Sequence, residues 1–201
     1  MLKPAPPNRS RPARAGACLY LTLLLGPAPL AAADPGSAPA AGSSVYQTQS
    51  DMLYNVAKFI DWPAGALSEA GALVVGVMGD DPFGAHLDTA LRNKTVSGHP
   101  VVVRRLDSPA RLNECHVLFV GASGSRQAAG ILRALGRAPV LTVGEGERFA
   151  RLGGIVAFIR DGGRMRLEIN LDAAERARLH VSSKLLRVAT VRRTAARRPG
   201  D

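Results

Sequence analysis

Leu73-Val-Val-Gly-Val-Met78, followed by Gly79-Asp80-Asp81-Pro82, is the stretch of sequence that decides the fold. An almost wholly apolar run that ends at a glycine turn is typical of a β-strand covered on both faces. Four later runs share this signature: Val101–Val103, Val117–Val120, Val140–Val143 and Ile155–Ile159. The sequence therefore predicts one buried, mainly parallel sheet.

Helical patterns lie before and between these runs. In Tyr46–Ile60 the apolar residues recur at helical spacing, and Pro63 predicts that this helix stops near Asp61. Three further helices are expected: Pro82–Leu91, Ser125–Leu135 and Glu147–Leu152. Strands that alternate with helices indicate an α/β protein with right-handed crossovers.

The C-terminal part departs from this alternation. Asp161-Gly162-Gly163 is a hairpin signal, and the apolar residues of Met165–Ile169 alternate with Arg164, Arg166 and Glu168. This pattern predicts an antiparallel strand near the sheet edge, with the charged residues on a solvated face. A helix over Leu171–Arg178 and a closing helix from Ser183 to about Val191, capped by Ser182, are expected to follow. We thus predict a single-domain three-layer sandwich with a mostly parallel sheet, an antiparallel C-terminal edge hairpin and helices on both faces.

The N-terminus has the pattern of an export signal. Basic residues without an acid precede the apolar run Cys18–Leu30, and Ala31-Ala-Ala33 offers a cleavage site. No later stretch has the roughly 20 continuous apolar residues that a membrane span needs. We therefore expect a signal peptide over 1–33, a flexible leader over 34–44, an α/β domain over 45–191, a disordered basic tail over 192–201 and a periplasmic location.

The charge and the cysteine content limit which partners and which cysteine chemistry are expected. The formal net charge is +10, but four bases lie in the signal segment and four arginines in the tail, so the folded body is nearly balanced. The body lacks a basic stripe with aromatic residues, which argues against a nucleic-acid partner. Cys115 is the one cysteine after the signal segment. We expect it to be buried and inert, with a reactive or intermolecular thiol as the alternative.

A ligand crevice is one candidate site. Asp80, Ser123, Ser125 and Glu145 follow predicted strands, and ligands of open α/β sheets lie beyond the carboxyl ends of the strands. Amides at the following helix starts could hold an anion or a carboxylate. The alternative is that Asp80, Asp81 and Ser125 simply cap helices.

Catalytic and metal signatures are weak. His86, His99, His116 and His180 do not have metal-ligand spacing, and no glycine loop carries a phosphate-binding lysine. Asp80 and Glu145 could form a carboxylate pair, but no third group supports acid–base chemistry. We expect neither an enzyme nor a bound cofactor or metal.

A second candidate site is a protein-binding face. Phe59 and Trp62 beside Lys58 form one half of it, and Leu185 and Leu186 beside Lys184 form the other. Aromatic and apolar anchors next to basic residues dominate many protein interfaces. The alternative for each of these residues is packing in the core.

Six blocks, in this order along the chain, resemble the YfiR family. The blocks are Lys58-Phe-Ile-Asp-Trp62-Pro63, Gly79-Asp-Asp-Pro-Phe-Gly84, Cys115-His-Val-Leu-Phe119, Leu141-Thr-Val-Gly-Glu145, Glu168-Ile-Asn170 and Ser182-Ser-Lys-Leu-Leu186. The resemblance implies a periplasmic repressor that contacts the periplasmic sensor domain of an inner-membrane diguanylate cyclase and so controls cyclic di-GMP and biofilm formation. It also implies a homodimer without stable membrane insertion. Some relatives carry disulfides, from which this chain departs.

The residues also leave a different function open. A free-standing periplasmic ligand-binding protein or sensor subunit would use the crevice of Asp80, Ser123 and Glu145. Ligand-induced stabilisation without a protein partner would distinguish it from the repressor.

Overall fold

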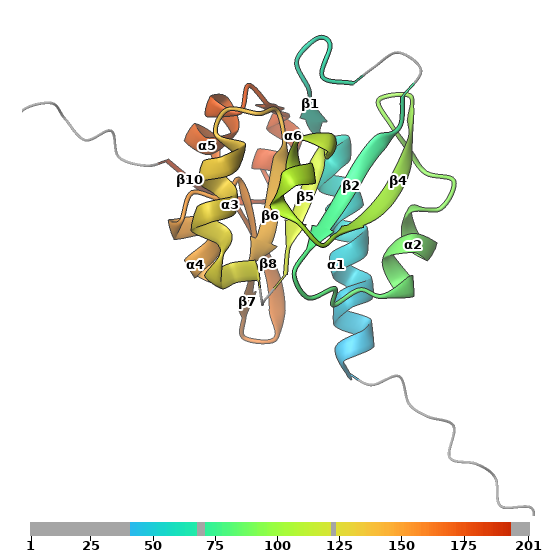
Figure 1. Cartoon of the computed structure of the whole chain (residues 1–201). Helices are drawn as coiled ribbons and strands as arrows, with labels where there is room; N and C mark the ends of the chain where they lie inside the picture. Colours follow the sequence, from blue (N-terminus) through green and yellow to red (C-terminus); the bar gives the residue numbers. More distant parts are fainter. Residues whose placement is uncertain (1–40, 68–70, 122–123, 194–201) are drawn as a thin grey trace, which may run out of the picture. The chain divides into compact units, whose positions relative to one another are not determined.

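An eight-stranded sheet forms the centre of the protein (Figure 1). The structure is a computed structural model that describes residues 41–67, 71–121 and 124–193. The strand order is β10-β8-β7-β6-β5-β2-β4-β3. The long strands are β2 (Leu73–Met78), β4 (His99–Leu106), β5 (Val117–Val120), β6 (Leu141–Glu145), β7 (Val156–Asp161) and β8 (Arg164–Asn170). Short strands, β3 (Thr95–Val96) and β10 (Thr190–Arg192), occupy the edges.

The predicted parallel sheet is confirmed. Strand β2 pairs in parallel with both β4 and β5, and β5, β6 and β7 continue in parallel on one side. The chain therefore runs from β2 outward to β4 and then returns past β2 to β5. This reversal places a topological switch point between β2 and β5.

Helices cover both faces, so the predicted three-layer sandwich is confirmed. One apolar cluster joins the sheet to α1 (Ala41–Lys58), α2 (Ala85–Leu91), α5 (Leu171–Arg176) and α6 (Ser183–Leu186). A second cluster, on the opposite face, joins it to η1 (Pro109–Glu114), α3 (Ala128–Leu135) and α4 (Gly146–Arg151). A short turn, η2 (Gly124–Arg126), precedes α3. Successive residues of a strand feed opposite clusters because their side chains point to opposite faces.

Two glycines make room for the largest side chain of α4. The ring of Phe149 is only 1% exposed, and a Cβ on Gly144 or Gly154 would lie 2.6 Å or 2.1 Å from its nearest ring atom. Strand β6 and the segment before β7 can therefore approach α4 closely only because neither glycine carries a side chain.

The first helix differs from its prediction at both ends. It stops at Lys58 rather than near Asp61, because Ile60–Asp61 forms a short strand, β1, that needs extended backbone. It begins at Ala41, so the last four residues of the expected leader are helical. The remaining leader and the expected signal peptide lie outside the described residues.

The predicted closing helix is wrong beyond Leu186. Helix α6 stops there, and Thr190–Arg192 runs parallel to β8 as the edge strand β10. The β7–β8 hairpin is confirmed, but β8 is covered on its outer side. Residues 194–201 of the expected tail lie outside the described residues, whereas Arg192 belongs to the sheet.

The expected solvated ladder of Arg164, Arg166 and Glu168 is wrong at Glu168, whereas Arg164 and Arg166 are exposed as predicted. Glu168 is 6% exposed and accepts a hydrogen bond from Arg192 Nε, because β10 and its arginine cover this half of β8. Arg166 instead lies 3.7 Å from Asp161 across the hairpin.

Within the described ranges, none of the helices combines the length and the apolar character that a bilayer crossing requires.

Candidate functional site

A two-stranded junction joins the two stretches that the sequence singled out as a protein-binding face. Strand β1 pairs antiparallel with β9 (His180–Val181), with Ile60 opposite Val181 and Asp61 opposite His180. The amide of Ser182 donates to the carbonyl of Phe59 at 2.9 Å. The face predicted from two segments more than 110 residues apart is thus one continuous region.

The residues predicted for the first half of this face differ in their contacts and burial. Lys58 Nζ lies 5.4 Å from the centroid of the Tyr54 ring, so Lys58 reaches toward Tyr54. Trp62 is half-buried against the core, and its Nε1 is buried without a hydrogen-bond partner in the described part of the chain. Phe59 is half-buried and lines a groove.

The second half of the face is anchored by α6. The hydroxyl of Ser182 accepts from the amide of Lys184 at 3.4 Å, which confirms the predicted cap. Leu185 is buried at the start of this short helix, Leu186 is half-buried and Lys184 is exposed. Of these three side chains, Leu185 lines the same groove as Phe59.

This groove, the α1–β8–α6 groove, has a volume of about 550 Å³. Three segments supply its apolar lining: Met52 and Val56 of α1 with Phe59 just after it, Met165 and Leu167 of β8, and Leu185 of α6 with Val188 just after it. Asn55, Asp161, Arg164 and Arg166 complete the lining. Val188 is 76% exposed, the largest exposed fraction of any large apolar residue in the described ranges.

The groove could not be assembled from the sequence alone. The spacing of Met52, Val56 and Phe59 marks one side of a helix, and the alternation of Met165 and Leu167 marks one face of a strand. That these two patterns meet depends on α6 ending early and on Val188 lying outside a helix.

The predicted ligand crevice does not form a single cavity around its residues. Ser123 and the side chain of Ser125 lie outside the described part. The end of β5 closes against the end of β2, since a Cβ on Gly121 would lie 2.0 Å from the carbonyl oxygen of Asp80. Gly79 and Gly124 border one cavity of about 410 Å³ on this side of β5.

Glu145 belongs to a different cavity, of about 500 Å³, at the ends of β6 and β7. It accepts a hydrogen bond from Gln49 Nε2 of α1 at 2.8 Å. Gln49 is 1% exposed, and its Oε1 is buried without a partner among the described residues. Asp80 and Glu145 are therefore held by separate surroundings and not as a carboxylate pair.

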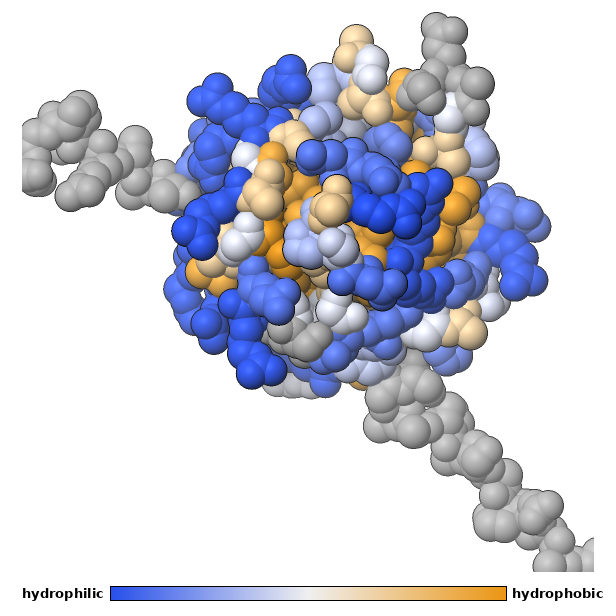
Figure 2. Space-filling model, viewed as in Figure 1, coloured by the Kyte–Doolittle hydropathy of each residue, from blue (hydrophilic) through white to orange (hydrophobic). Residues whose placement is uncertain are grey.

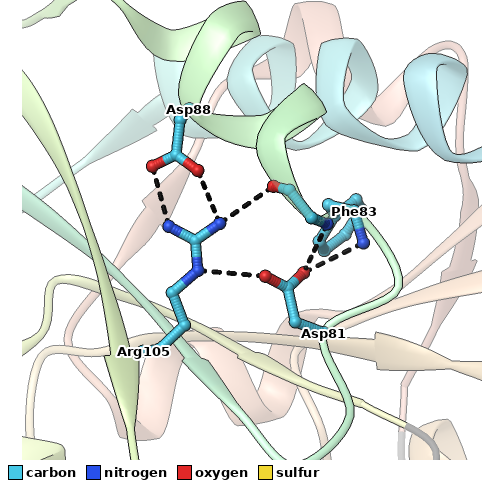
Figure 3. A network of polar contacts seen from close by, with 5 residues as sticks. Asp81, Phe83, Asp88 and Arg105 are labelled. Atoms are coloured by element: carbon cyan, nitrogen blue, oxygen red, sulfur yellow. Dashed lines mark hydrogen bonds and ion pairs between the residues drawn. The ribbon is translucent and has the colours of Figure 1, made fainter.

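A network around Arg105 fixes the turn between β2 and α2 (Figure 3). Its guanidinium donates to both carboxylate oxygens of Asp88 at 2.7 Å and 2.6 Å, to Asp81 Oδ2 at 3.0 Å and to the carbonyl of Gly84 at 2.9 Å. Asp81 Oδ1 accepts from the amides of Phe83 and Gly84. Hydrogen bonding to Arg105 lowers the pKa of Asp88, and hydrogen bonding to Asp88 raises the pKa of Arg105. Asp81 thus stabilises the turn before α2, but its capping interpretation is wrong, because Gly84 is the N-cap of this helix and no side chain caps it.

Cys115 and His116 are structural. Burial raises the pKa of the Cys115 thiol to about 11, as expected for an inert cysteine. His116 Nδ1 accepts from the amide of Val74 at 2.9 Å, so its Nε2–H donates to the carbonyl of Ala66 at 3.1 Å. Burial lowers the pKa of His116, which favours this neutral ring. The described residues contain no group of three His, Cys, Asp or Glu side chains placed to hold a metal.

The face that carries α3 and α4 has a further hollow. Figure 2 shows hydrophobic residues in the middle of this face, surrounded by hydrophilic ones. A cavity of about 510 Å³ lies where α3, α4 and α5 end, and Arg133 and Arg176 are its charged lining residues. Arginines near helix C-termini are explained by the carbonyl ends of the helices, so they do not indicate an anion site.

The doubly wound sheet with helices on both faces defines a domain of the α/β class. A family model described as YfiR/HmsC-like matches residues 46–190, and the chain belongs to this family. Membership confirms the resemblance seen in the six sequence blocks and supports a regulatory class of protein in cyclic di-GMP signalling.

Solved structures share the fold. A conserved domain protein from Vibrio cholerae superimposes with a TM-score of 0.50 at 12% identity, over 74% of this chain and 60% of that one. An ABC domain from Streptococcus pneumoniae in complex with L-Trp gives a TM-score of 0.47 at 11% identity, over 73% of this chain and 60% of that one. The chain thus covers about 60% of the length of these proteins. The first similarity concerns the α/β fold alone, and the second is too distant to carry an argument.

Proposed function

We propose that the protein is a periplasmic repressor that binds the periplasmic sensor domain of an inner-membrane diguanylate cyclase. By holding the cyclase inactive it would lower cyclic di-GMP and restrain biofilm formation. Membership of the YfiR/HmsC-like family supports the signalling context. The export signal expected over 1–33 supports the compartment.

The α1–β8–α6 groove is the observation that carries the proposed mode of action. Contiguous exposed apolar surface rimmed by polar residues marks interaction sites on soluble proteins. Here Phe59 and Leu185 connect the groove floor to the β1–β9 junction, while Val188 presents most of its surface to solvent. The groove therefore offers a partner an anchored apolar site at little cost in rearrangement.

Repression requires differential binding. The repressor must bind the inactive conformation of the cyclase more tightly than the active one, because equal affinity for both would shift nothing. A difference of about 1.4 kcal/mol shifts the equilibrium tenfold. A homodimer of the repressor is part of this proposal, and light scattering at micromolar concentration tests it by the measured mass.

Binding to the sensor domain tests the function. The mature protein and the sensor domain of a membrane cyclase encoded beside its gene are purified and titrated by calorimetry. We expect saturable binding with one defined stoichiometry. Absence of binding to every such neighbouring sensor domain would contradict the proposal.

A small-ligand function is the second candidate. It rests on Gln49, whose buried Oε1 lacks a partner, beside Glu145 at the cavity of about 500 Å³. A ligand that donates hydrogen bonds would match these two acceptors. Thermal-shift screening with amino acids, nucleotides and amines, without a protein partner, distinguishes it: stabilisation that Gln49→Leu abolishes would favour this function over the repressor.

A further inference from the structure

The α1–β8–α6 groove has the pattern of surface that receives a helix. Met52, Val56 and Phe59 follow one another at i, i+4 and i+7, so they form a stripe along roughly 10 Å of α1. Leu185 and Val188 form the opposite wall, and Met165 and Leu167 share one face of β8 as the floor. Helix α1 on one side and the segment from Leu185 to Val188 on the other leave the space of a helix in the layer that covers this face of the sheet.

The charges around the groove select the partner. Arg164 and Arg166 border it but alternate with Met165 and Leu167, so their side chains point to the other face of β8, whereas Lys184 and Arg187 are exposed on the wall beside Leu185 and Val188. Asp161 is the one acid of the lining, and it lies 3.7 Å from Arg166. The surroundings are therefore net positive.

This charge argues against a second copy of the chain as the occupant. Two such grooves facing each other would bring arginines and lysines together, and like charges in an interface cost affinity. A partner with acidic residues on either side of an apolar stripe would instead complement the groove.

The lining is also adaptable. Two of its apolar side chains, Met52 and Met165, are methionines, which are unbranched and fit ligands of varied shape. Helix-binding grooves commonly recognise apolar anchors at i, i+3, i+4 and i+7. The shape, the charge and the side-chain chemistry therefore agree on one class of ligand.

We propose that the α1–β8–α6 groove binds an amphipathic helix of the partner, whose apolar stripe contacts Met52, Phe59 and Val188 and whose acidic flank faces Lys184 and Arg187. The identity of that partner as a cyclase sensor domain rests on the proposed function. The helix-binding property itself does not.

Fluorescein-labelled peptides of 18 residues test the groove by anisotropy. The acidic peptide has leucines in a helical stripe and glutamates elsewhere; the basic peptide replaces the glutamates by lysines; the scrambled peptide keeps the acidic composition without the stripe. We expect the acidic peptide to bind at least tenfold more tightly than either of the others. Lys184→Glu with Arg187→Glu should reverse the preference toward the basic peptide.

Matched variants locate the site. Val188→Glu should weaken binding of the acidic peptide at least tenfold, whereas Val102→Glu, at an exposed valine of β4 on the other side of the sheet, should leave it unchanged. Equal affinity for the three peptides, or equal binding by wild type and Val188→Glu, would overturn the inference. So would binding of anionic phosphatidylglycerol vesicles that Val188→Glu abolishes while no peptide binds.

The same variants separate this inference from the proposed function. If a sensor domain binds wild type and Val188→Glu equally well, the groove inference fails and the repressor function stands. If the acidic peptide binds wild type but no sensor domain does, the repressor function fails and the groove inference stands.

Discussion

Replacing Gly154 by alanine should destabilise the protein strongly, although it adds only one methyl group. The new Cβ would lie 2.1 Å, 2.4 Å and 2.6 Å from three ring atoms of Phe149, about 1 Å closer than real contacts allow. The ring cannot retreat, because Gly144 packs against it from β6 and the side chain is only 1% exposed. Overpacking of this kind costs about 1–3 kcal/mol, and we expect the upper half of that range.

Gly130→Ala is the matched control. Gly130 lies inside α3, is exposed and has open space around its Cβ position. Alanine in place of glycine within a helix should stabilise the protein by about 0.5–1 kcal/mol. Replacing glycine by alanine should thus lower the free energy of unfolding at Gly154 and raise it at Gly130, with a difference of about 3 kcal/mol between the two variants.

Thermal and urea unfolding, each followed by circular dichroism, measure both variants. For a domain of about 150 residues, the melting temperature should fall by about 4–12 °C for Gly154→Ala and rise by about 1–4 °C for Gly130→Ala. Phe149→Val removes the clashing ring atoms, so Gly154→Ala should cost far less in that background. A Gly154→Ala variant within about 0.5 kcal/mol of wild type, or an undiminished cost beside Phe149→Val, would refute the packing argument.

Three further predictions concern the charged groups and the groove. Arg105→Met should cost about 1 kcal/mol at pH 7, because the side chains of Arg105 and Asp88 are each more than a third exposed, and denaturant titration measures this loss. The pKa of Asp88 is lowered from 3.8 in the folded protein, so the stabilisation by its ion pair with Arg105 is present above pH 3.8 and is lost as pH falls through the folded-state pKa of Asp88. An equal cost of Arg105→Met at pH 2 would contradict this reasoning. The pKa of His116 is lowered from 6.5, so the unfolded chain binds more protons below that pH and stability should fall as pH decreases from about 6.5. His116→Gln should flatten this slope in unfolding measured between pH 5 and 7, and an unchanged slope would exclude His116 as its source. Val188→Glu should change the free energy of unfolding by less than about 0.5 kcal/mol, as expected of a surface position, and a larger loss would mean that Val188 supports the fold.

Most of the sheet could be predicted because its long strands carry local sequence signals. Leu73–Met78 and Val117–Val120 are buried along their whole length, so their apolar runs reflect burial on both faces directly. The hairpin could also be predicted, because Asp161-Gly162-Gly163 forms its turn and both glycines adopt the positive φ that such a turn requires.

The C-terminal segment could not be predicted in the same way. Residues Thr190–Arg192 are helix-compatible in isolation, and only pairing with β8 and the contact of Arg192 with Glu168 make them a strand. Likewise Ile60–Asp61 leaves the first helix because His180–Val181 offers it backbone partners. Both departures arise from contacts between segments distant in sequence, which local propensity does not contain.

The candidate sites were also predictable only in part from the sequence. The neighbourhood of Phe59 and Leu185 followed from the sequence blocks, whereas the contributions of Met165 and Val188 required the tertiary arrangement. The crevice prediction placed Asp80 and Glu145 at the correct ends of β2 and β6, but the packing of Gly121 against Asp80 and the bond from Gln49 to Glu145 separate them.

Cyclic di-GMP synthesis by inner membranes that contain the neighbouring cyclase tests the central claim most directly. The mature protein is added to the periplasmic side of spheroplast membranes, and the rate of synthesis is measured against its concentration. We predict a saturable decrease with wild type and with Val102→Glu, and a curve shifted at least tenfold to higher concentration with Val188→Glu. Synthesis that stays constant at saturating protein, or that falls equally with all three proteins, would contradict repression through this groove.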